Sequence, residues 1–408
     1  MPAMLRLPIT NVYAKGDYTV TVCVGSEAVP MQLVLDTGSS TLALHAAHYR
    51  TELDSDLTTT TLVQEVIYGI GGWAGAVVQT SMQLHGDISL TLPENYIAVA
   101  AVGTMAFTKA DGILGLAYKR LNQATDISQY LQQQQPPTQS SLPWPFPEAD
   151  VAQLSNIQKL LAGYPQRNLV PWFSHIEQFG KVADTFAFYC RRSSVHYAQD
   201  IATPLADDPL NQGWFILGGG TEQQDLYQGA FKNISVLHDV YYNVQLTALQ
   251  VGDQPLIPCI LGNNGDAANG FFDTGASVIL LPNLLYQQLL QQFVQYNLSL
   301  ATVLQQLPIF NGTEQGIDAQ LVDLTQWPPL HFYFTGDAGN TVKLTCPPGD
   351  YWQHNAPAFG LCSFKLIPQL PHFASQHILG LPLLCNYYTV FDRSAHHTGI
   401  IRCALARR

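Results

Sequence analysis

Charged side chains are scarce in this chain of 408 residues. Lysine and arginine together number 18 and aspartate and glutamate 30, which makes 12% of the residues charged against 47% hydrophobic. A disordered acidic chain combines high net charge with low hydrophobicity, so this composition excludes that class. Nucleic acid binding needs clustered basic residues, whereas the Lys and Arg residues here are few and scattered. We therefore expect a folded protein with no nucleic acid partner.

Long apolar runs are also missing. No stretch of about 18 apolar residues occurs, so we expect no membrane-spanning helix and no membrane partner. The N-terminal sequence MPAMLRLPITNVYAKGDYTV lacks the apolar core of a secretory signal. The expected location is therefore cytoplasmic, or secreted or periplasmic if the N-terminus has been trimmed.

Cysteine is infrequent, and the seven residues are widely spaced with no Cys-x-x-Cys pair. The odd number leaves at least one thiol unpaired, and a chain of this length does not need a disulfide framework. Cys346 and Cys362, which flank a Pro-Pro-Gly turn, form the one pair that we consider as a candidate disulfide. We expect no metal and no cofactor, because the closely spaced histidines lack a third ligand at a suitable spacing. These histidines are His45, His48, His396 and His397.

Short apolar or alternating segments bounded by Gly, Pro, Asn and Asp dominate the chain, and their length and β-branched content favour strands. The segments expected as strands are 18–24, 31–35, 88–92, 96–100, 214–217 and 278–281. Helical periodicity is confined chiefly to 151–161, 171–179 and 284–296. These patterns predict a chain that is mostly β, with few short helices.

One segment departs from this pattern. Between Gln123 and Asn168 the composition shifts to the Gln-, Pro- and Ser-rich sequence LQQQQPPTQSSLPWPFPEAD. Such a sequence is typical of segments that bury too little apolar surface to become ordered. Because strand patterns of one kind continue on both sides, we interpret 123–168 as a surface insertion within a domain.

A repeated motif divides the chain into two related halves. The first half contains VLDTGSS at 34–40 and ILGL at 113–116, and the second contains FFDTGAS at 271–277 and ILGL at 378–381. This repeated order predicts two similar lobes. We place the N-terminal lobe at 1–208, with the first Asp-Thr-Gly and the insertion, and the C-terminal lobe at 209–408, with the second Asp-Thr-Gly.

A single Asp-Thr-Gly sequence is most often a plain turn, in which glycine adopts a backbone conformation that other residues resist. Here Asp36 and Asp273 each follow two large apolar residues, so both end strands where an isolated carboxylate is costly to bury. If the lobes pack about a pseudo-twofold axis, the two carboxylates meet and share one proton, so that one is an acid and the other a base. Such a pair can activate a water molecule for attack on a peptide carbonyl.

These motifs make the sequence similar to the pepsin-like aspartic proteases. The resemblance covers nearly the whole chain outside the insertion. It rests on the two Asp-Thr-Gly motifs, DGILGLAY at 111–118, WFILGGG at 214–220, ILG at 378–380 and YYTVFD at 387–392. It implies an all-β, bilobal fold of two pseudo-twofold-related β lobes, with a long cleft for an extended peptide and a hairpin flap over that cleft.

The resemblance assigns the catalytic roles to Asp36 and Asp273. It implies support from Thr37, Gly38, Ser39, Thr274 and Gly275, and substrate contacts from Val34, Tyr68, Gly69, Ile113, Ala276 and Ser277. The expected enzyme is an aspartic endopeptidase that acts as a monomer on a peptide or protein substrate. Its preference is for hydrophobic residues at the cleaved bond, because the expected cleft walls are apolar. The alternative is a non-catalytic two-lobed binding or inhibitor protein of the same fold.

Departures from the family pattern change the expected mechanism. Ala43 stands where the family has a tryptophan that bonds the flap tyrosine, and Ile70 and Gly72 replace hydroxyl residues of the flap, so we expect a looser flap. The second motif has Ala276 where the first has Ser39, which removes one hydroxyl donor to a carboxylate. Hydrogen bonds to a carboxylate lower its pKa, so activity is expected nearer neutral pH than in a gastric enzyme.

The start of the chain differs from the secreted members of the family as well. The first expected strand begins close to the N-terminus, which leaves no room for the basic propeptide of those members. In this respect the sequence resembles the cytoplasmic bacterial members, and we expect a constitutively competent enzyme.

Overall fold

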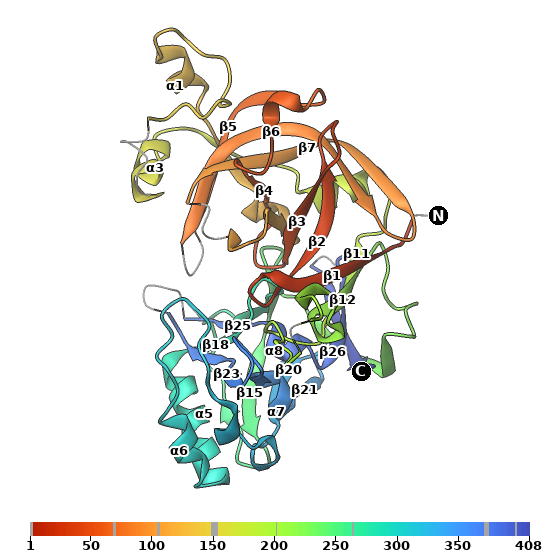
Figure 1. The fold of residues 1–408 in the computed structure, drawn as a ribbon, viewed down its shortest axis with the longest axis vertical. Coiled ribbons are helices and arrows are strands. Elements are labelled where there is room, and N and C mark those ends of the chain that lie inside the picture. Colours follow the sequence, from red (N-terminus) through yellow and green to blue (C-terminus); the bar gives the residue numbers. More distant parts are fainter. Residues whose placement is uncertain are drawn as a thin grey trace. The chain divides into compact units, whose positions relative to one another are not determined.

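The computed structural model describes residues 3–67, 71–103, 107–147, 154–200, 202–262, 265–370, 375–395 and 398–408. The chain forms two compact units (Figure 1). The first comprises Met1–Leu7 and Thr19–Ala183, and the second comprises Pro8–Tyr18 and Asp184–Arg408. The division after Ala183 lies earlier in the chain than the lobe boundary at 208 expected from the sequence.

The first unit consists mainly of strands. Strand β1 (Leu5–Ala14) begins in this unit and ends in the second. The other strands of the first unit are β2 (Asp17–Val24), β3 (Val29–Asp36), β4 (Leu42–His45), β5 (Thr58–Ile67), β6 (Gly72–His85), β7 (Ser89–Val102), β8 (Gly112–Gly115), β9 (Gln123–Asp126) and β10 (Gln166–Asn168). Its helices are α1 (Ser128–Gln133), α3 (Leu154–Leu161) and α4 (Trp172–Gln178), with the short 3-10 helices η1 (Thr51–Leu53) and η3 (Lys119–Leu121).

The strands of the first unit form a sheet in the order β10-β9-β5-β6-β7-β4-β8-β3-β2. An additional pairing of β6 with β2, through Cys23 with Gln83 and Val24 with Met82, closes part of this sheet into a barrel. The interior is apolar because inward positions of β2 and β3, such as Val20, Val22 and Leu33, are almost completely buried. The parallel neighbours β3 and β8 are buried where they pair, which explains why the paired residues Leu33–Leu35 and Ile113–Leu114 are consecutive apolar residues rather than alternating ones.

The Gln- and Pro-rich insertion is ordered, so the expectation that 123–168 cannot order itself is wrong for its described residues. Its ends pair as β9 and β10, and α1 and α3 lie against β5 and β6 (Figure 1). The insertion contributes most of a small apolar cluster that packs on two residues of the β5–β6 hairpin, Val63 and Ala74. The buried insertion residues are Ile127, Leu131, Phe146, Ile157 and Leu161. The segment therefore becomes ordered on an existing surface and does not need a complete core of its own.

The second unit contains more strands than the first, and it contains α5, the longest described helix. Its strands are β11 (Thr185–Tyr189), β12 (Gln212–Leu217), β13 (Tyr227–Ser235), β14 (Tyr242–Val244), β15 (Leu246–Val251), β16 (Ile257–Pro258), β17 (Gly270–Phe272), β18 (Ile279–Leu281), β19 (Ile317–Asp318), β20 (Leu330–Thr335), β21 (Thr341–Cys346), β22 (Trp352–His354), β23 (Leu361–Phe364), β24 (Leu366–Pro368), β25 (His377–Leu379), β26 (Tyr387–Asp392) and β27 (Ile400–Ala406). The α-helices are α5 (Asn283–Tyr296), α6 (Leu300–Leu304), α7 (Pro348–Tyr351) and α8 (Leu381–Leu384). The 3-10 helices are η4 (Leu205–Asp207), η5 (Pro209–Asn211), η7 (Ala319–Leu321) and η8 (Leu324–Gln326).

Four groups of strands make up the second unit. They have the orders β12-β11-β26-β27-β13, β14-β17-β25-β18-β24, β16-β15-β20-β21 and β19-β23-β22. Helix α5 covers β15 and β24 with a buried stripe that includes Leu285, Leu289 and Phe293. The spacing of these residues places them on one helical face.

Most elements expected from the sequence are present. The six predicted strands correspond to β2, β3, β7, β12 and β18, with 88–92 and 96–100 joined in the single strand β7, and residues 88 and 278 lie just before β7 and β18. The three predicted helices correspond to α3, α4 and α5, and residues 151–153 lie outside the described part of the chain. The candidate disulfide is wrong: Cys346 and Cys362 are free, and the Cys346 thiol donates to the Pro382 carbonyl at 3.2 Å.

Candidate active site

The first half-site lies at the end of β3, whose last residue is Asp36. Strand β3 runs parallel to β8, and the register pairs Asp36 with Gly115. Beyond this pair, the Leu116 N–H donates to the Asp36 carbonyl at 2.7 Å and the Gly115 N–H donates to the Thr41 carbonyl at 2.9 Å. A Cβ atom on Gly115 would lie 2.6 Å from backbone atoms of Ser40 and Thr41, so only glycine allows this approach.

The carboxylate of Asp36 accepts hydrogen bonds from its own turn. The Gly38 N–H donates to Oδ1 at 2.7 Å, and the Ser39 hydroxyl donates to Oδ2 at 2.5 Å. Asp36 is 6% exposed and Thr37 is fully buried. The turn therefore holds a nearly buried carboxylate in a fixed orientation with donors that favour its ionised form.

The second half-site lies directly after β17. The Asp273 N–H donates to the Leu379 carbonyl at 3.1 Å, and the Gly275 N–H donates to the Asp273 carboxylate at 2.9 Å. Strand β17 runs parallel to β25, with Phe272 opposite Leu379. Thr274 is buried, while Asp273, Gly275, Ala276 and Ser277 are half-buried.

A glycine follows β25 as well. A Cβ atom on Gly380 would lie 2.1 Å from the Val278 carbonyl oxygen and 2.2 Å from that of Ala276. Directly after it, the Leu381 N–H at the start of α8 donates to the Ala276 carbonyl at 2.8 Å. The Asp-Thr-Gly turn of this unit is therefore packed against the glycine of its Ile-Leu-Gly strand.

The strands around the two half-sites have the same order, direction and register. In each unit the aspartate strand runs parallel to the Ile-Leu-Gly strand. The strand after each turn runs antiparallel to the same Ile-Leu-Gly strand, with Ala43 opposite Ile113 and Leu280 opposite Ile378. A fourth strand, β7 or β24, then adds in parallel. The sequence repeat is thus a structural repeat, and each unit brings together its own Asp-Thr-Gly and Ile-Leu-Gly segments.

The other predicted contact residues of the first unit lie near this half-site or outside the described residues. Val34 and Ile113 face each other across β3 and β8 and are 7% and 5% exposed. The predicted hairpin is present, because β5 and β6 pair up to Ile67 opposite Gly72. Tyr68 and Gly69, at its tip, lie outside the described residues.

Three histidines on or beside the strands of the half-sites either have a lowered pKa or contact a carboxylate. Burial, followed by the neighbouring His48, lowers the pKa of His45. His48 Nδ1 lies 2.7 Å from the carboxylate of Asp111, which also accepts the Gln32 N–H at 2.7 Å and so fixes the segment that leads into β8. In the second unit His377 is 2% exposed and burial lowers its pKa to about 4.

Neither a metal centre nor a membrane helix is found in the part of the chain that the structure describes. The described His, Cys, Asp and Glu side chains form no group of three or more placed to hold a metal ion. His396 and His397 lie outside the described residues. Among the described residues, no helix is long and apolar enough to cross a bilayer.

Comparison with known families shows to which family a chain with these two half-sites belongs. A sequence model described as eukaryotic aspartyl protease matches residues 17–136 and 204–403. The chain belongs to the aspartyl protease family. Both Asp-Thr-Gly turns and both Ile-Leu-Gly strands lie within the matched residues, and the stretch from 137 to 203 lies between them.

Individual aspartyl proteases are similar over long stretches. A cathepsin D of Chionodraco hamatus is 23% identical, covering 96% of this chain and 82% of its own. A beta-secretase of Strongylocentrotus purpuratus is 19% identical, covering 94% of this chain and 66% of its own. Pepsin B of the dog is 28% identical over 46% of this chain and 41% of its own. The family membership makes this protein an aspartic endopeptidase, a hydrolase whose substrates are peptides or proteins.

Sequence reasoning missed one residue that supports the first half-site of the protease. Trp172, the first residue of α4, is 2% exposed and its indole N–H donates to the Gly115 carbonyl at 2.7 Å. Gly115 is the register partner of Asp36, so this contact holds the strand beside the aspartate. Trp172 lies between the two stretches matched by the family model. Its helical periodicity was visible in the sequence, but no local pattern indicates which carbonyl an indole N–H will reach.

Proposed function

We propose that Asp36 and Asp273 act together on one water molecule and hydrolyse peptide bonds in extended polypeptides. One carboxylate removes a proton from the water as its oxygen attacks the peptide carbonyl carbon, and the other, protonated, donates a hydrogen bond to the carbonyl oxygen. Transfer of a proton to the amide nitrogen of the resulting tetrahedral intermediate then breaks the C–N bond and releases a carboxylic acid and an amine.

The observation that carries this proposal is the shared register of the two half-sites. Each aspartate ends or directly follows a strand that is parallel to an Ile-Leu-Gly strand, and each carboxylate accepts the N–H of the glycine two residues later. Each turn supplies one carboxylate, and two carboxylates that meet in one site share a proton because two adjacent negative charges are unfavourable.

The two turns differ in one residue type that can donate to the carboxylate, and we assign the ionised form to Asp36 on this ground. The Ser39 hydroxyl donates to Asp36, whereas the equivalent residue of the second turn, Ala276, has no hydroxyl. A donor to the charged form favours ionisation, so the shared proton belongs on Asp273 in the resting enzyme.

We also propose a preference for hydrophobic residues at the cleaved bond. Val34 and Ile113 lie opposite each other on the strand pair that carries Asp36, and both retain slight exposure. An apolar substrate side chain covering these groups would remove further apolar surface from water, which favours binding.

The test compares Asp36→Asn and Asp273→Asn with the wild type, using a denatured protein as the substrate between pH 3 and pH 7. Each substitution keeps the side-chain shape and removes the acid, so cleavage should fall by at least about a hundredfold while circular dichroism stays unchanged. Asp207→Asn, at an exposed position in η4, is the matched control and should retain full activity. Pepstatin should inhibit the wild type and the control alike.

Two outcomes would contradict the proposal. Activity that survives either active-site substitution would remove that aspartate from the mechanism. A wild-type protein that binds the denatured substrate but cleaves it at no pH would instead indicate a non-catalytic binding protein of the same fold.

A further inference from the structure

We propose that Cys190 and Cys385 are a modification site: a dithiol that closes to a disulfide bond when the folded protein meets a small-molecule disulfide such as oxidised glutathione. Both residues belong to the second unit, Cys190 directly after β11 and Cys385 directly after α8. This inference concerns groups outside the catalytic mechanism and goes beyond the protease activity.

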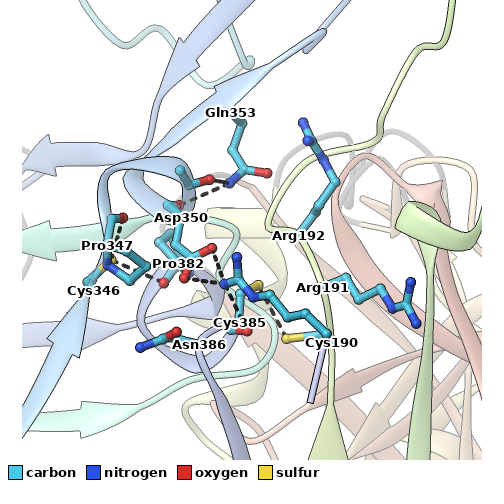
Figure 2. A network of polar contacts seen from close by, with 12 residues as sticks. Cys190, Arg191, Arg192, Cys346, Pro347, Asp350, Gln353, Pro382, Cys385 and Asn386 are labelled. Atoms are coloured by element: carbon cyan, nitrogen blue, oxygen red, sulfur yellow. Dashed lines mark hydrogen bonds and ion pairs between the residues drawn. The ribbon is translucent and has the colours of Figure 1, made fainter. Parts of the chain in front are cut away.

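The first support is the distance between the two sulfur atoms. Cys190 Sγ and Cys385 Sγ lie 3.3 Å apart, and Figure 2 shows the two side chains pointing toward each other. A disulfide has a sulfur separation of about 2.05 Å, so a shift of little more than 1 Å closes the bond. Cys190 is 1% exposed and Cys385 is fully buried, so packing holds both side chains in place.

The second support comes from the backbone and does not depend on either rotamer. Strands β11 and β26 are antiparallel, and the last pair of their ladder is Tyr189 opposite Tyr388. Cys190 is the next residue along one strand, and Cys385 lies just before β26 on the other. Both cysteines therefore leave the same end of one ladder, and this register brings them together.

The third support is selectivity among the seven cysteines. All seven are free in this structure. Within the described residues, Cys190 and Cys385 are the only two whose sulfur atoms lie within hydrogen-bonding distance of each other. The Cys346 thiol donates instead to the Pro382 carbonyl, and Cys403 Sγ lies 3.9 Å from the Thr389 hydroxyl. An oxidant that reaches this unit should thus produce one defined bond.

The reaction balances with the disulfide reagent as the electron acceptor. A thiolate of the pair attacks one sulfur of the reagent and releases one reagent thiolate, which leaves a mixed disulfide on the protein. The second protein sulfur then attacks the first, forms the Cys190–Cys385 bond and releases the second reagent thiolate. Two protein thiols lose two protons and two electrons, and one reagent disulfide becomes two thiols.

Burial sets the expected rate. It raises the pKa of Cys385 well above the usual range, so little thiolate is present near neutral pH and the first step is slow. The second step joins two sulfur atoms of the same chain that lie 3.3 Å apart. It should therefore be faster than the reverse reaction, in which a free reagent thiol attacks the mixed disulfide. We therefore expect closure over hours and a bond that is protected once formed.

The disulfide would tie β11 to the segment that supports the second Asp-Thr-Gly turn. The Cys385 N–H donates to the Leu381 carbonyl at 2.8 Å, and the Leu381 N–H donates to the Ala276 carbonyl at 2.8 Å. The short helix α8 thus spans the distance between the dithiol and the turn of Asp273. Closing the bond restricts the unfolded chain between two residues far apart in the sequence, which stabilises the folded state.

The experiment uses the wild-type protein with oxidised glutathione or with dithiothreitol at pH 8.5. One sample is kept folded overnight, and a second is refolded from urea in the same buffers. The oxidised samples should lose about 2 Da in intact mass, and peptide mapping should show residue 190 linked to residue 385. The melting temperature should rise by roughly 5 °C or more, and dithiothreitol should reverse both changes.

Matched variants separate this bond from general effects of cysteine oxidation. Cys190→Ala and Cys385→Ala should abolish the mass loss and the rise in melting temperature on oxidation. Cys403→Ala removes an equally buried cysteine and should retain both changes. Two findings in the wild type would overturn the inference. One is that all cysteines can still be alkylated after unfolding in both the folded and the refolded oxidised samples. The other is a disulfide that links any other pair of cysteines. Neither readout depends on catalysis, so failure here is distinct from failure of the proposed function.

Discussion

The clearest chemical difference between the two aspartate turns is a single hydroxyl group. Ser39 donates to Asp36 at 2.5 Å, and Ala276 takes the equivalent place after Asp273. We predict that Ala276→Ser shifts the pH profile of kcat/KM toward acid by about half a unit to one unit, because an added donor favours the ionised carboxylate. A series of initial rates between pH 2 and pH 7 measures the shift.

Ser39→Ala is the reciprocal variant and should move the profile in the opposite direction, toward neutral pH. The two variants together distinguish an electrostatic effect from a loss of packing, since packing defects would lower the rate without moving the profile in opposite senses. Profiles that shift in the same direction, or that do not shift, would show that these hydroxyl positions do not set the ionisation of the pair.

At the scale of single residues, the contacts that the sequence predicted are local ones, such as the approach of the Gly38 and Gly275 N–H groups to the carboxylates. Asp36 and Asp273 can be recognised in the sequence because the next two or three residues form the turn that holds each carboxylate. Trp172 was missed because its partner, the Gly115 carbonyl, is distant in the sequence. Hydrogen-bond chemistry follows from residue type, but the identity of a distant partner follows only from the fold.

At the scale of elements, the insertion shows how a segment of weak composition becomes ordered. Tyr130, Trp144 and Phe146 form ring contacts of 4.9 to 5.0 Å within the insertion. Together with α1 and α3 they cover Val63 and Ala74 of the β5–β6 hairpin. The Gln and Pro content indicated disorder, because composition does not reveal an apolar surface elsewhere that the few large residues can cover.

We predict that Phe146→Ala destabilises the first unit by about 3 to 5 kcal/mol, because it removes a buried aromatic ring from the centre of this cluster. The ring is 4% exposed. Urea unfolding gives the change in free energy. Hydrogen exchange should show faster exchange in β5 and β6, since the hairpin loses the cluster that covers it.

Phe179→Ala is the control for this variant. Phe179 lies in the same unit but is 48% exposed, so its loss should cost less than about 1 kcal/mol. If Phe146→Ala unfolds at the wild-type urea concentration and the exchange of β5 and β6 is unchanged, the insertion does not stabilise the hairpin.

At the scale of the whole molecule, the sequence predicted the fold class and the two-fold repetition but not how buried charge is balanced. Asp350 in α7 is 1% exposed, and an Arg408 guanidinium nitrogen lies 2.6 Å from both of its carboxylate oxygens. Its neighbourhood is drawn in Figure 2. His377 in β25 is equally buried, and its Nδ1 has no partner among the described residues. Nothing in the local sequence of either residue indicates such burial.

Asp350 and His377 make the stability of the second unit depend on pH in opposite directions. Burial raises the pKa of Asp350 to about 6, although Arg408 favours the charged form. The unfolded value is about 3.9, so the stability from Asp350 is complete below pH 4 and is lost as the pH rises through 6. Burial lowers the pKa of His377 to about 4 against about 6.5 unfolded. The stability from His377 is therefore present above pH 6.5 and is lost as the pH falls through 4.

Each group changes the free energy of unfolding by about 2 kcal/mol between pH 4.5 and pH 6.5, with opposite signs, so in the wild type the two changes cancel. We predict that Asp350→Asn becomes more stable as the pH rises across this range, because only the His377 contribution remains. His377→Gln should become less stable over the same range. Urea unfolding at four pH values measures both slopes relative to the wild type, which removes the effect of every other titrating group.

Parallel curves of unfolding free energy against pH for all three proteins would contradict the prediction. Opposite slopes would show that two buried ionisable groups oppose each other and keep the stability of the second unit nearly constant across this pH range.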